Sequence, residues 1–358
     1  MLARKVPRET HLLERGDQFK PGRVVQPGVP ASLNPIPENE PINRLRFAQW
    51  LVDPKTPTTA RALVNRVWQQ YFGTGIVATT EDLGSQCEPP SHPELLDWLA
   101  IELQQNGWRL KPLHRLIVSS ATYQQASSAS GEAYAHDPAN RLLARGPRFR
   151  LDAEAIRDTY LAASGLLNLE IGGPAVHPPA PAFLFLPPSS FGAKSWEEDK
   201  DAQRYRRALY TFRFRTATYP MLQTFDAPTG EFACARRTLS NTPLQALTLL
   251  NEPMSLECAK GLARATLSAG GSTDADRIQY AFRRCTARSA SAAEQTRLAK
   301  FLATEQDKMN GEPTRPLELL GVTDEKNLNF SAASPAQYAA WTALSRVLLS
   351  LDETITKE

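Results

Sequence analysis

The sequence lacks the short motifs that usually identify a redox or metal-binding protein. It has four cysteines, and none stands in a C-x-x-C or C-x-x-C-H arrangement, so neither a zinc ribbon nor haem attachment is predicted. Its five histidines include no pair spaced as in H-E-x-x-H, so no metal site is predicted. The cysteines are expected to be small buried residues: Cys87, Cys234, Cys258 and Cys285.

Long apolar runs, targeting signals and an excess of one charge are also missing. No run approaches the roughly 20 apolar residues of a membrane-spanning helix, and residues 1–10 contain no apolar segment typical of a secretory signal. The chain as given is therefore expected to stay in the cytoplasm. Its net charge of +3, from 41 basic and 38 acidic residues, is too balanced to favour nucleic-acid binding.

Motifs for covalent or nucleotide chemistry are absent as well, because the chain has no G-x-S-x-G, no phosphate-binding P-loop and no G-x-G-x-x-G. Hydrophobic residues make up 42% of the chain, which is enough to form a buried core of normal size. The 28 prolines outnumber the 19 glycines, which favours long ordered loops between short helices. With 358 residues, the chain can form one large domain or two closely packed ones.

Apolar residues recur at spacings of three and four through most of the chain, which is typical of helices with one buried face. Around residues 60–71 this pattern follows a predicted N-cap at Thr58 or Thr59 and ends at Gly73. Ser91 and Glu94 form a predicted capping box before another helix. Further helices are expected over residues 43–51, 113–121, 151–165, 243–250, 254–268, 274–285, 292–306 and 335–351, with a loop over 310–332. Asn43 is the predicted cap of the first, Ser291 and Glu294 form a second predicted capping box, and Ser334 starts the last.

The middle of the chain has a different pattern. Prolines are frequent between residues 172 and 188, and aromatic residues then alternate with polar ones over Tyr210–Phe214. This alternation predicts a half-buried strand over Leu209–Arg215, with a partner around residues 174–177.

We therefore predict a mainly α protein, a compact multi-helix domain with long proline-rich loops and a minor β element around residues 206–216. A proline-rich extended arm is expected over residues 1–42. A single helical domain would follow over 43–358, made of a helical part (43–165), a loop and strand insert (166–235) and a second helical part (236–358).

A series of short segments, spread over nearly the whole chain, forms a specific pattern. The segments are Asn43–Leu45, Ala60–Trp68, Pro90–Leu99, Leu113–Ile117, Asp137–Leu142, Leu151–Asp158, Gly172–Pro174, Thr224–Pro228, Cys234–Arg237, Thr242–Leu247 and Leu348–Ile355. In this order they resemble the domain of unknown function 1553, a C-terminal domain found in planctomycetes and verrucomicrobia.

The resemblance implies a context rather than a reaction, because the family has no established activity. Its members usually carry this domain behind a signal peptide, a cytochrome c-like domain and another domain of unknown function, and they are often exported to the periplasm or the cell surface. The implied role is an accessory binding domain of a larger exported, redox-linked protein. Haem would belong to the upstream cytochrome c-like domain, an expected partner, and no cofactor is expected in this chain.

Two groups of polar residues are candidate ligand-binding sites, and the first lies on one predicted helix. Arg61 and Asn65 are four residues apart and share a helix face, and Arg66 follows them. Guanidinium groups bind carboxylate, sulfate and phosphate, so this face could hold an anion. The alternative is that these side chains hydrogen-bond to loop carbonyls and stabilise the fold.

The second group lies before a predicted helix N-terminus and consists of Asp226, Arg236, Arg237, Thr242 and Gln245. Thr242 followed by proline predicts the start of a helix, whose free N–H groups favour an anion when arginines lie nearby. The alternative is an ion pair of Asp226 with Arg236 or Arg237 that pins the loop.

Other arginines could line a groove for an acidic polymer, but the acidic residues near them favour mutual pairing instead. The arginines are Arg141, Arg145, Arg148, Arg150, Arg157, Arg204, Arg206, Arg207, Arg213 and Arg215, and the acids include Asp152, Glu154, Asp158, Glu197, Glu198, Asp199 and Asp201.

The leading hypothesis is a non-catalytic domain that binds an anionic carbohydrate or a protein partner. The alternative is a hydrolase or lyase that acts on polysaccharide and uses His92, Glu94 or Asp226, with histidine as a proton shuttle beside a carboxylate. The alternative requires these side chains to share one cleft. His92 and Glu94 could instead have only a local role at the start of a helix.

Overall fold

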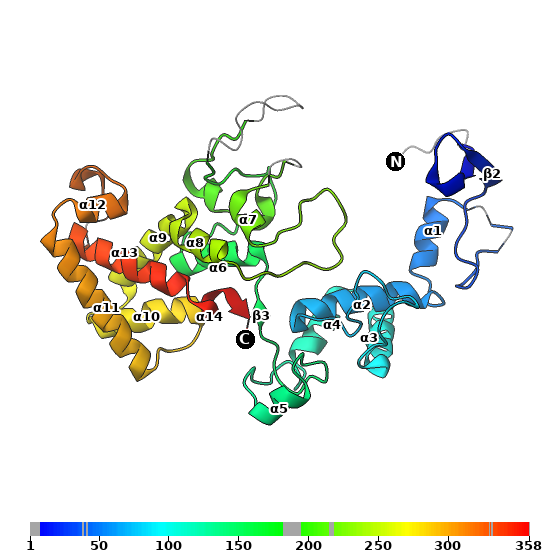
Figure 1. Ribbon diagram of the computed structural model, residues 1–358, viewed down its shortest axis with the longest axis horizontal. Coiled ribbons are helices and arrows are strands. Elements are labelled where there is room, and N and C mark those ends of the chain that lie inside the picture. Colours follow the sequence, from blue (N-terminus) through cyan, green and yellow to red (C-terminus); the bar gives the residue numbers. More distant parts are fainter. Residues whose placement is uncertain are drawn as a thin grey trace. The chain divides into compact units, whose positions relative to one another are not determined.

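Figure 1 shows the computed structural model of the chain, which is mainly α-helical as predicted. The structure describes residues 8–37, 39–40, 42–181, 195–214, 218–328, 330 and 332–357. The chain forms two compact units, Met1–Gly146 and Pro147–Glu358, and each has its own buried core. This grouping differs from the single helical domain predicted for residues 43–358.

The N-terminal segment of the first unit contains an antiparallel hairpin. Strands β1 (Thr10–Leu13) and β2 (Pro21–Val25) pair with Thr10 opposite Val25. Pro21 is tolerated because it is the first residue of its strand. The segment predicted as an extended arm is therefore paired with itself in this part.

The helices of the first unit begin at local sequence signals. They are α1 (Arg44–Leu51), α2 (Pro57–Phe72), α3 (Pro93–Gln105), α4 (Leu110–Val118) and α5 (Gly131–His136). Asn43 caps α1 as predicted, since its side chain accepts a hydrogen bond from the N–H of Arg46 at 2.9 Å.

Two predicted helix starts are wrong, and proline explains both. Helix α2 begins at Pro57 behind Thr56, rather than behind Thr58 or Thr59. Helix α3 begins at Pro93 behind His92, so the capping box predicted for Ser91 and Glu94 does not form. Proline lacks an N–H and its fixed φ suits the first helical position, so the helix starts there in each case.

The core of the first unit lies where α2 packs against α3 and α3 packs against α4. The apolar stripe that predicted α2 is its buried face, and Gly73 ends the helix with a positive φ of 77°. The buried side chains are Val64, Val67, Trp68, Phe72, Ile76, Val77, Leu96, Leu99, Leu103, Leu113 and Ile117.

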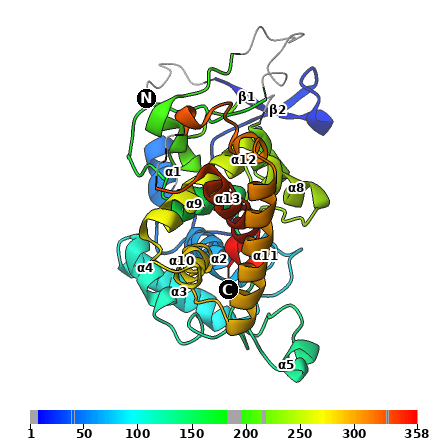
Figure 2. The same ribbon diagram turned by 90° about the vertical axis from the view of Figure 1, so that its left-hand side faces the viewer.

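The second unit is a helical assembly around α13, which lies between α9 and α11 in Figure 2. Trp341 of α13 is fully buried. The helices are α6 (Ala153–Ser164), α7 (Pro220–Thr224), α8 (Pro243–Asn251), α9 (Pro253–Ala269), α10 (Asp274–Thr286), α11 (Ala292–Gly311), α12 (Arg315–Leu320), α13 (Pro335–Leu349) and α14 (Asp352–Ile355). Strand β3 (Phe149–Arg150) pairs antiparallel with β4 (Thr356–Lys357).

Several predicted helix starts in the second unit are confirmed. Ser291 and Glu294 form a complete capping box on α11, and Ser334 caps α13. The loop predicted over 310–332 is wrong in part, because it contains α12 and a short 3-10 helix at Glu325–Asn327. These elements are too short to show a helical period in the sequence.

The strand predicted over Leu209–Arg215 does not form in its described part, which ends at residue 214. A 3-10 helix occupies Ala208–Tyr210, and single bridges join Arg206 to Asn168 and Thr211 to Val176. The partner region predicted around residues 174–177 is therefore confirmed at one position. In the described part of the segment the β element is reduced to these isolated bridges. The alternation of residue types does not give the predicted buried aromatic face, since Thr211 is buried and Tyr210 and Phe212 are half-buried.

Candidate functional site

A pocket of about 950 Å³ runs along one face of α6 in the second unit. Ile156, Arg157 and Tyr160 of this helix point into the core, and the opposite face carries Glu154 and Asp158. The two carboxylates are four residues apart, so they lie one turn apart on the same face. The pocket is lined by Asp152, Glu154, Ala155, Asp158, Thr159, Ala162, Leu167, Ala175, Arg207, Ala208, Leu209, Thr211, Phe212, Arg213 and Arg237.

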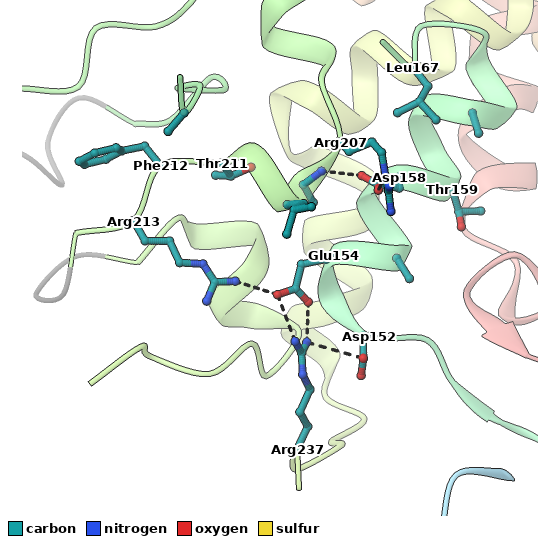
Figure 3. A pocket seen from close by; sticks show the side chains of 15 residues that line it. Asp152, Glu154, Asp158, Thr159, Leu167, Arg207, Thr211, Phe212, Arg213 and Arg237 are labelled. Carbon is teal, nitrogen blue, oxygen red and sulfur yellow. Dashed lines mark hydrogen bonds and ion pairs between the residues drawn. The ribbon is translucent and has the colours of Figure 1, made fainter. Parts of the chain in front are cut away.

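Two arginines converge on Glu154 from different segments (Figure 3). Nη2 of Arg213 donates to Oε1 of Glu154 at 2.7 Å. Arg237 donates from Nη1 to Oε2 at 2.5 Å and from Nη2 to Oε1 at 3.3 Å, which is a two-pronged contact. Both oxygens of one carboxylate are thus held by guanidinium groups at the edge of the pocket.

Asp152 lies beside this cluster as the N-cap residue of α6, although its side chain makes no capping hydrogen bond. Its Oδ2 atom is 3.7 Å from Nη1 of Arg237. Burial raises the pKa of Asp152, and the charge of Glu154 adds to the rise while that of Arg237 opposes it.

The charged form is favoured in both Glu154 and Arg237, whereas the neutral form is favoured in Asp152. Burial favours a higher pKa for Glu154, but hydrogen bonds from Arg237 and from its own backbone N–H, with the charges of Arg237 and Arg213, lower it below its usual value. Burial likewise opposes the charge on Arg237, and its carboxylate partners outweigh that effect and raise its pKa. The cluster is therefore an ionised pair beside a carboxyl group that binds its proton more readily.

Asp158 connects the two walls of the pocket. Its Oδ1 accepts a hydrogen bond from the backbone N–H of Ala208 at 2.6 Å, and its Oδ2 lies 3.2 Å from Nε of Arg207. Because one of its partners is a backbone group, this carboxylate fixes the position of the 3-10 helix at Ala208–Tyr210. Asp158 is thus part of the frame of the pocket.

The remaining surface of the pocket is largely apolar and includes one unusual hydroxyl group. Leu167, Leu209 and Phe212 supply apolar surface. Thr211 is 6% exposed, and its buried hydroxyl oxygen has no hydrogen-bond partner among the described residues. A buried polar group without a partner costs free energy, so a polar ligand atom at this wall would be stabilising.

Behind the pocket, two fully buried arginines bind backbone carbonyls instead of carboxylates. Arg157 donates to the carbonyls of Arg206 at 2.6 Å and Arg204 at 2.8 Å. Arg206 donates to the carbonyls of Pro174 at 3.1 Å and of Gly172, and its guanidinium lies 3.9 Å from the centre of the Tyr210 ring. These side chains hold the loops that form the pocket wall.

The candidate group before α8 is divided by the structure. Asp226 accepts from the N–H and the hydroxyl of Ser240 at 2.8 and 2.7 Å, and Arg237, one of its two predicted ion-pair partners, binds Glu154 instead. Arg237 pairs with Glu154 and lines the pocket, whereas Arg236 is exposed and lies outside the pocket lining.

Thr242 and Gln245 form a complete capping box at the start of α8, as a threonine followed by proline predicted for the helix start. Gln245 is 1% exposed and also donates to the carbonyl of Thr224 at 3.0 Å and to the hydroxyl of Ser240 at 3.1 Å. Together with Asp226 these residues join the two ends of the loop between α7 and α8. They position the loop that carries Arg237.

The candidate group on α2 has three different environments. Asn65 is fully buried, donates to the carbonyl of Val77 and accepts from its N–H, both at 2.9 Å. This matches the alternative of a structural hydrogen-bond hub. Arg61 forms an ion pair of 2.5 Å with Asp97, and Arg66 is exposed. The three side chains do not share one set of contacts.

The contacts of the three catalytic candidates do not indicate an acid–base pair. His92 is the N-cap of α3 and its Nδ1 lies 3.0 Å from the hydroxyl of Ser91, and Glu94 is exposed in the first turn. Both belong to the first unit, whereas Asp226 belongs to the second. The idea that all of them take part in one reaction stays a prediction.

Among the charged residues of the pocket, Arg237 was predicted to bind a ligand, whereas the others were predicted to pair with one another. That pairing is confirmed by Arg213 with Glu154, by Arg207 with Asp158 and by Arg204 with Glu198. The signal that could have marked the site is the pair of acids four residues apart on α6, on the face opposite its apolar stripe. Arg215 of the same series lies outside the described residues.

The cysteines and the possible metal ligands add no further site. Cys258 and Cys285 are buried as predicted, whereas Cys87 is half-buried and Cys234 is exposed, and none of the four is in a disulfide. Burial raises the pKa of both Cys258 and Cys285 to about 12. Within the part of the chain that the structure describes, no group of three His, Cys, Asp or Glu side chains is placed to hold a metal ion. None of the helices there combines the length and apolar character needed to cross a membrane.

Comparison with known proteins gives one finding. No curated protein and no solved structure matches the chain. A family model does match residues 43–302, which include α6, Arg213 and Arg237. The chain therefore belongs to the PSD1 family, described as proteins of unknown function (DUF1553).

Proposed function

We propose that the chain is a binding domain and that its ligand, an acidic carbohydrate, occupies the α6 pocket. The observation that carries this proposal is the convergence of Arg213 and Arg237 on one point at the edge of a pocket of about 950 Å³. A volume of this order fits the usual range of small-molecule sites. Paired guanidinium groups are the side chains best suited to a carboxylate or a sulfate.

The other walls of the pocket suit a sugar. Leu209, Phe212 and Leu167 offer apolar surface to the C–H faces of a sugar ring. Thr211 has a buried hydroxyl that lacks a partner and could pair with a polar group of the ligand. Apolar walls with a few polar groups at fixed positions are the common composition of ligand sites.

The family resemblance supports the second part of the proposal, which concerns the context. In this view the domain serves a larger exported, redox-linked protein, beside a cytochrome c-like domain of the kind found in planctomycete relatives. Haem would then be held by that neighbour.

Equilibrium binding of oligogalacturonate, dextran sulfate and uncharged dextran tests the proposed ligand class. Arg213→Gln and Arg237→Gln should each weaken the binding of oligogalacturonate about tenfold or more, since each removes a charge-assisted hydrogen-bond donor. The control is Arg288→Gln, which removes an arginine paired with Glu294 and Glu353 outside the pocket. Absence of binding, or equal weakening in all three variants, would overturn the proposal.

A polysaccharide hydrolase or lyase is the second candidate, and one geometric observation favours it. Nη1 of Arg237 lies 2.5 Å from Glu154 and 3.7 Å from Asp152, so two carboxyl groups whose pKa values shift in opposite directions share one cation. Such pairs supply the acid and the base in many enzymes. Release of new sugar ends from polygalacturonate, abolished by Asp152→Asn, would establish it, and no release would remove it.

A further inference from the structure

The carboxylate of Glu154 lies between Arg213 and Arg237, where the carboxylate of an acidic ligand would bind. Its two oxygens receive three hydrogen bonds from Arg213 and Arg237, at 2.7, 2.5 and 3.3 Å. No better set of donors for an anion exists among the residues that line the pocket, since the third arginine, Arg207, is paired with Asp158. An acidic ligand in this pocket must compete with Glu154 for the same two guanidinium groups.

We infer that Glu154 is an internal substitute for the acidic group of the ligand, and that the ligand displaces it on binding. This contact is autoinhibitory, because it occupies the anion-binding position of the free protein. The inference rests on the proposed function and adds to it the identity of the group that the ligand replaces.

Both arginines have a second contact that would keep them in place after Glu154 leaves. Nη1 of Arg213 donates to the carbonyl of Pro228 at 3.2 Å. Nη1 of Arg237 remains 3.7 Å from Asp152, and its loop is fixed at the base by the hydrogen bonds from Ser240 to Asp226. The two guanidinium groups therefore form a binding position that does not depend on Glu154.

The position of Glu154 gives its side chain a path toward water. It lies in the first turn of α6, and its side chain is 22% exposed. A carboxylate in the first turn remains stabilised by the helix dipole and the free N–H groups when it rotates toward water. Asp158 differs, because its hydrogen bond to the N–H of Ala208 fixes the opposite wall of the pocket.

A second feature of the pocket wall is the hydroxyl group of Thr211. Thr211 is more than nine-tenths buried at the pocket wall, and its hydroxyl oxygen finds no partner among the described residues. Interiors rarely leave such a group unpaired. An occupant that contacts the two arginines would replace Glu154, and a small movement of the wall would let it pair with the Thr211 hydroxyl as well.

The inference makes an unusual prediction, because removing a charged side chain from the site should improve binding. Binding of oligogalacturonate is measured by titration calorimetry for the full chain and for Glu154→Gln, which keeps the size of the side chain and removes its charge. The affinity should rise about fivefold to a hundredfold, the usual range for two coupled equilibria. Uncharged dextran should bind the two proteins equally.

The controls separate this inference from the function on which it rests. Glu294→Gln removes a carboxylate that pairs with Arg288 outside the pocket, and it should leave the affinity unchanged. If the unmodified chain binds oligogalacturonate and Glu154→Gln binds it no better, the inference is wrong while the proposed function stands. If neither protein binds any acidic glycan, the proposed function itself is wrong. Equal gains for dextran and oligogalacturonate would show a general widening of the pocket and would also overturn the inference.

Discussion

The segment that follows α5 in the first unit and the α6 pocket of the second unit use arginine in different ways. In the first unit Arg141 donates to the carbonyls of Gly75 at 2.9 Å and Ile76 at 3.2 Å, and Arg145 donates to the carbonyls of Asp137 and Pro138 at 2.9 and 2.8 Å. At the pocket of the second unit the arginines bind side-chain carboxylates instead: Arg207, Arg213 and Arg237.

The difference decides which contacts can be exchanged for a ligand. A loop carbonyl cannot turn away from its donor without moving the backbone, and a buried carbonyl that loses its partner is costly. A side-chain carboxylate can rotate toward water at small cost when it is partly exposed. Arg157 and Arg206, buried behind the pocket, follow the first pattern. The buried arginines bound only to carbonyls therefore stabilise the fold, and the proposed function uses the carboxylate-bound arginines of the pocket.

The largest expected effect comes from a carbonyl-bound arginine. Arg157→Met should destabilise the second unit by about 3–5 kcal/mol, because it leaves the carbonyls of Arg204 and Arg206 without their buried donor. Hydrogen exchange measured over peptides of α9 and α13 reports the stability of this unit alone. A loss below about 1 kcal/mol would break the distinction between the two kinds of arginine.

In the first unit the matching test is the buried amide of α2. Asn65→Ala should cost about 2–3 kcal/mol, since it leaves the N–H and the carbonyl of Val77 without partners. The loss should appear as faster hydrogen exchange in the segment around residues 75–80. Arg66→Ala on the next, exposed position is the control and should stay within about 0.5 kcal/mol of the unmodified chain.

A carboxylate-bound arginine outside the pocket gives a smaller and pH-dependent effect. Hydrogen bonds from Arg288 and then from the N–H and hydroxyl of Ser291 lower the pKa of Glu294. Its contribution to stability is therefore present above the unfolded pKa of about 4.3 and is lost as the pH falls through the lower, folded pKa. Glu294→Gln should cost about 0.5–1 kcal/mol at pH 7.

The pH and salt dependence of that variant sharpens the comparison. Unfolding of the unmodified chain and of Glu294→Gln should differ less at pH 2 than at pH 7, and less in 1 M salt than in 0.1 M, because salt screens exposed charges. A difference that is constant across both series would assign the effect to the capping hydrogen bonds of Ser291 rather than to the ion pair with Arg288.

The smallest effect is expected at the exposed wall of the pocket. Arg207→Met should change the stability of the second unit by at most about 0.5 kcal/mol, because Arg207 is half exposed and its partner Asp158 keeps the hydrogen bond from Ala208. Thermal unfolding of Arg207→Met and Arg157→Met compares two contacts between α6 and residues 204–207. Arg157 binds carbonyls of that segment, whereas Arg207 binds the carboxylate of Asp158. Equal losses would contradict our interpretation.

Features that depend on a few neighbouring residues could be predicted from the sequence. Asn43, Ser291 and Thr242 cap helices as expected, because a cap needs only the residues of the first turn. The predicted starts at Thr58 and Ser91 failed where a proline close by had a stronger preference for the first helical position.

The strand predicted over Leu209–Arg215 failed for a different reason. Polar and apolar residue types alternate in this segment, but a strand also needs a continuous backbone partner. In its described part a single bridge joins Thr211 to Val176, through hydrogen bonds of Val176 with Tyr210 and Phe212. The sequence of Leu209–Arg215 does not show how many residues of another segment will pair with its backbone.

The sequence by itself determined the mainly helical class, most helix positions and the family, because periodicity, capping and family motifs are properties of the chain read in order. The pocket residues could be read in the sequence, but their arrangement in space could not. Only the tertiary structure decided that Glu154 lies between Arg213 and Arg237, which are 59 and 83 residues further along the chain. Side-chain pairing over such distances depends on how α6 and the two loops pack, and packing is a property of the whole unit that no local pattern records.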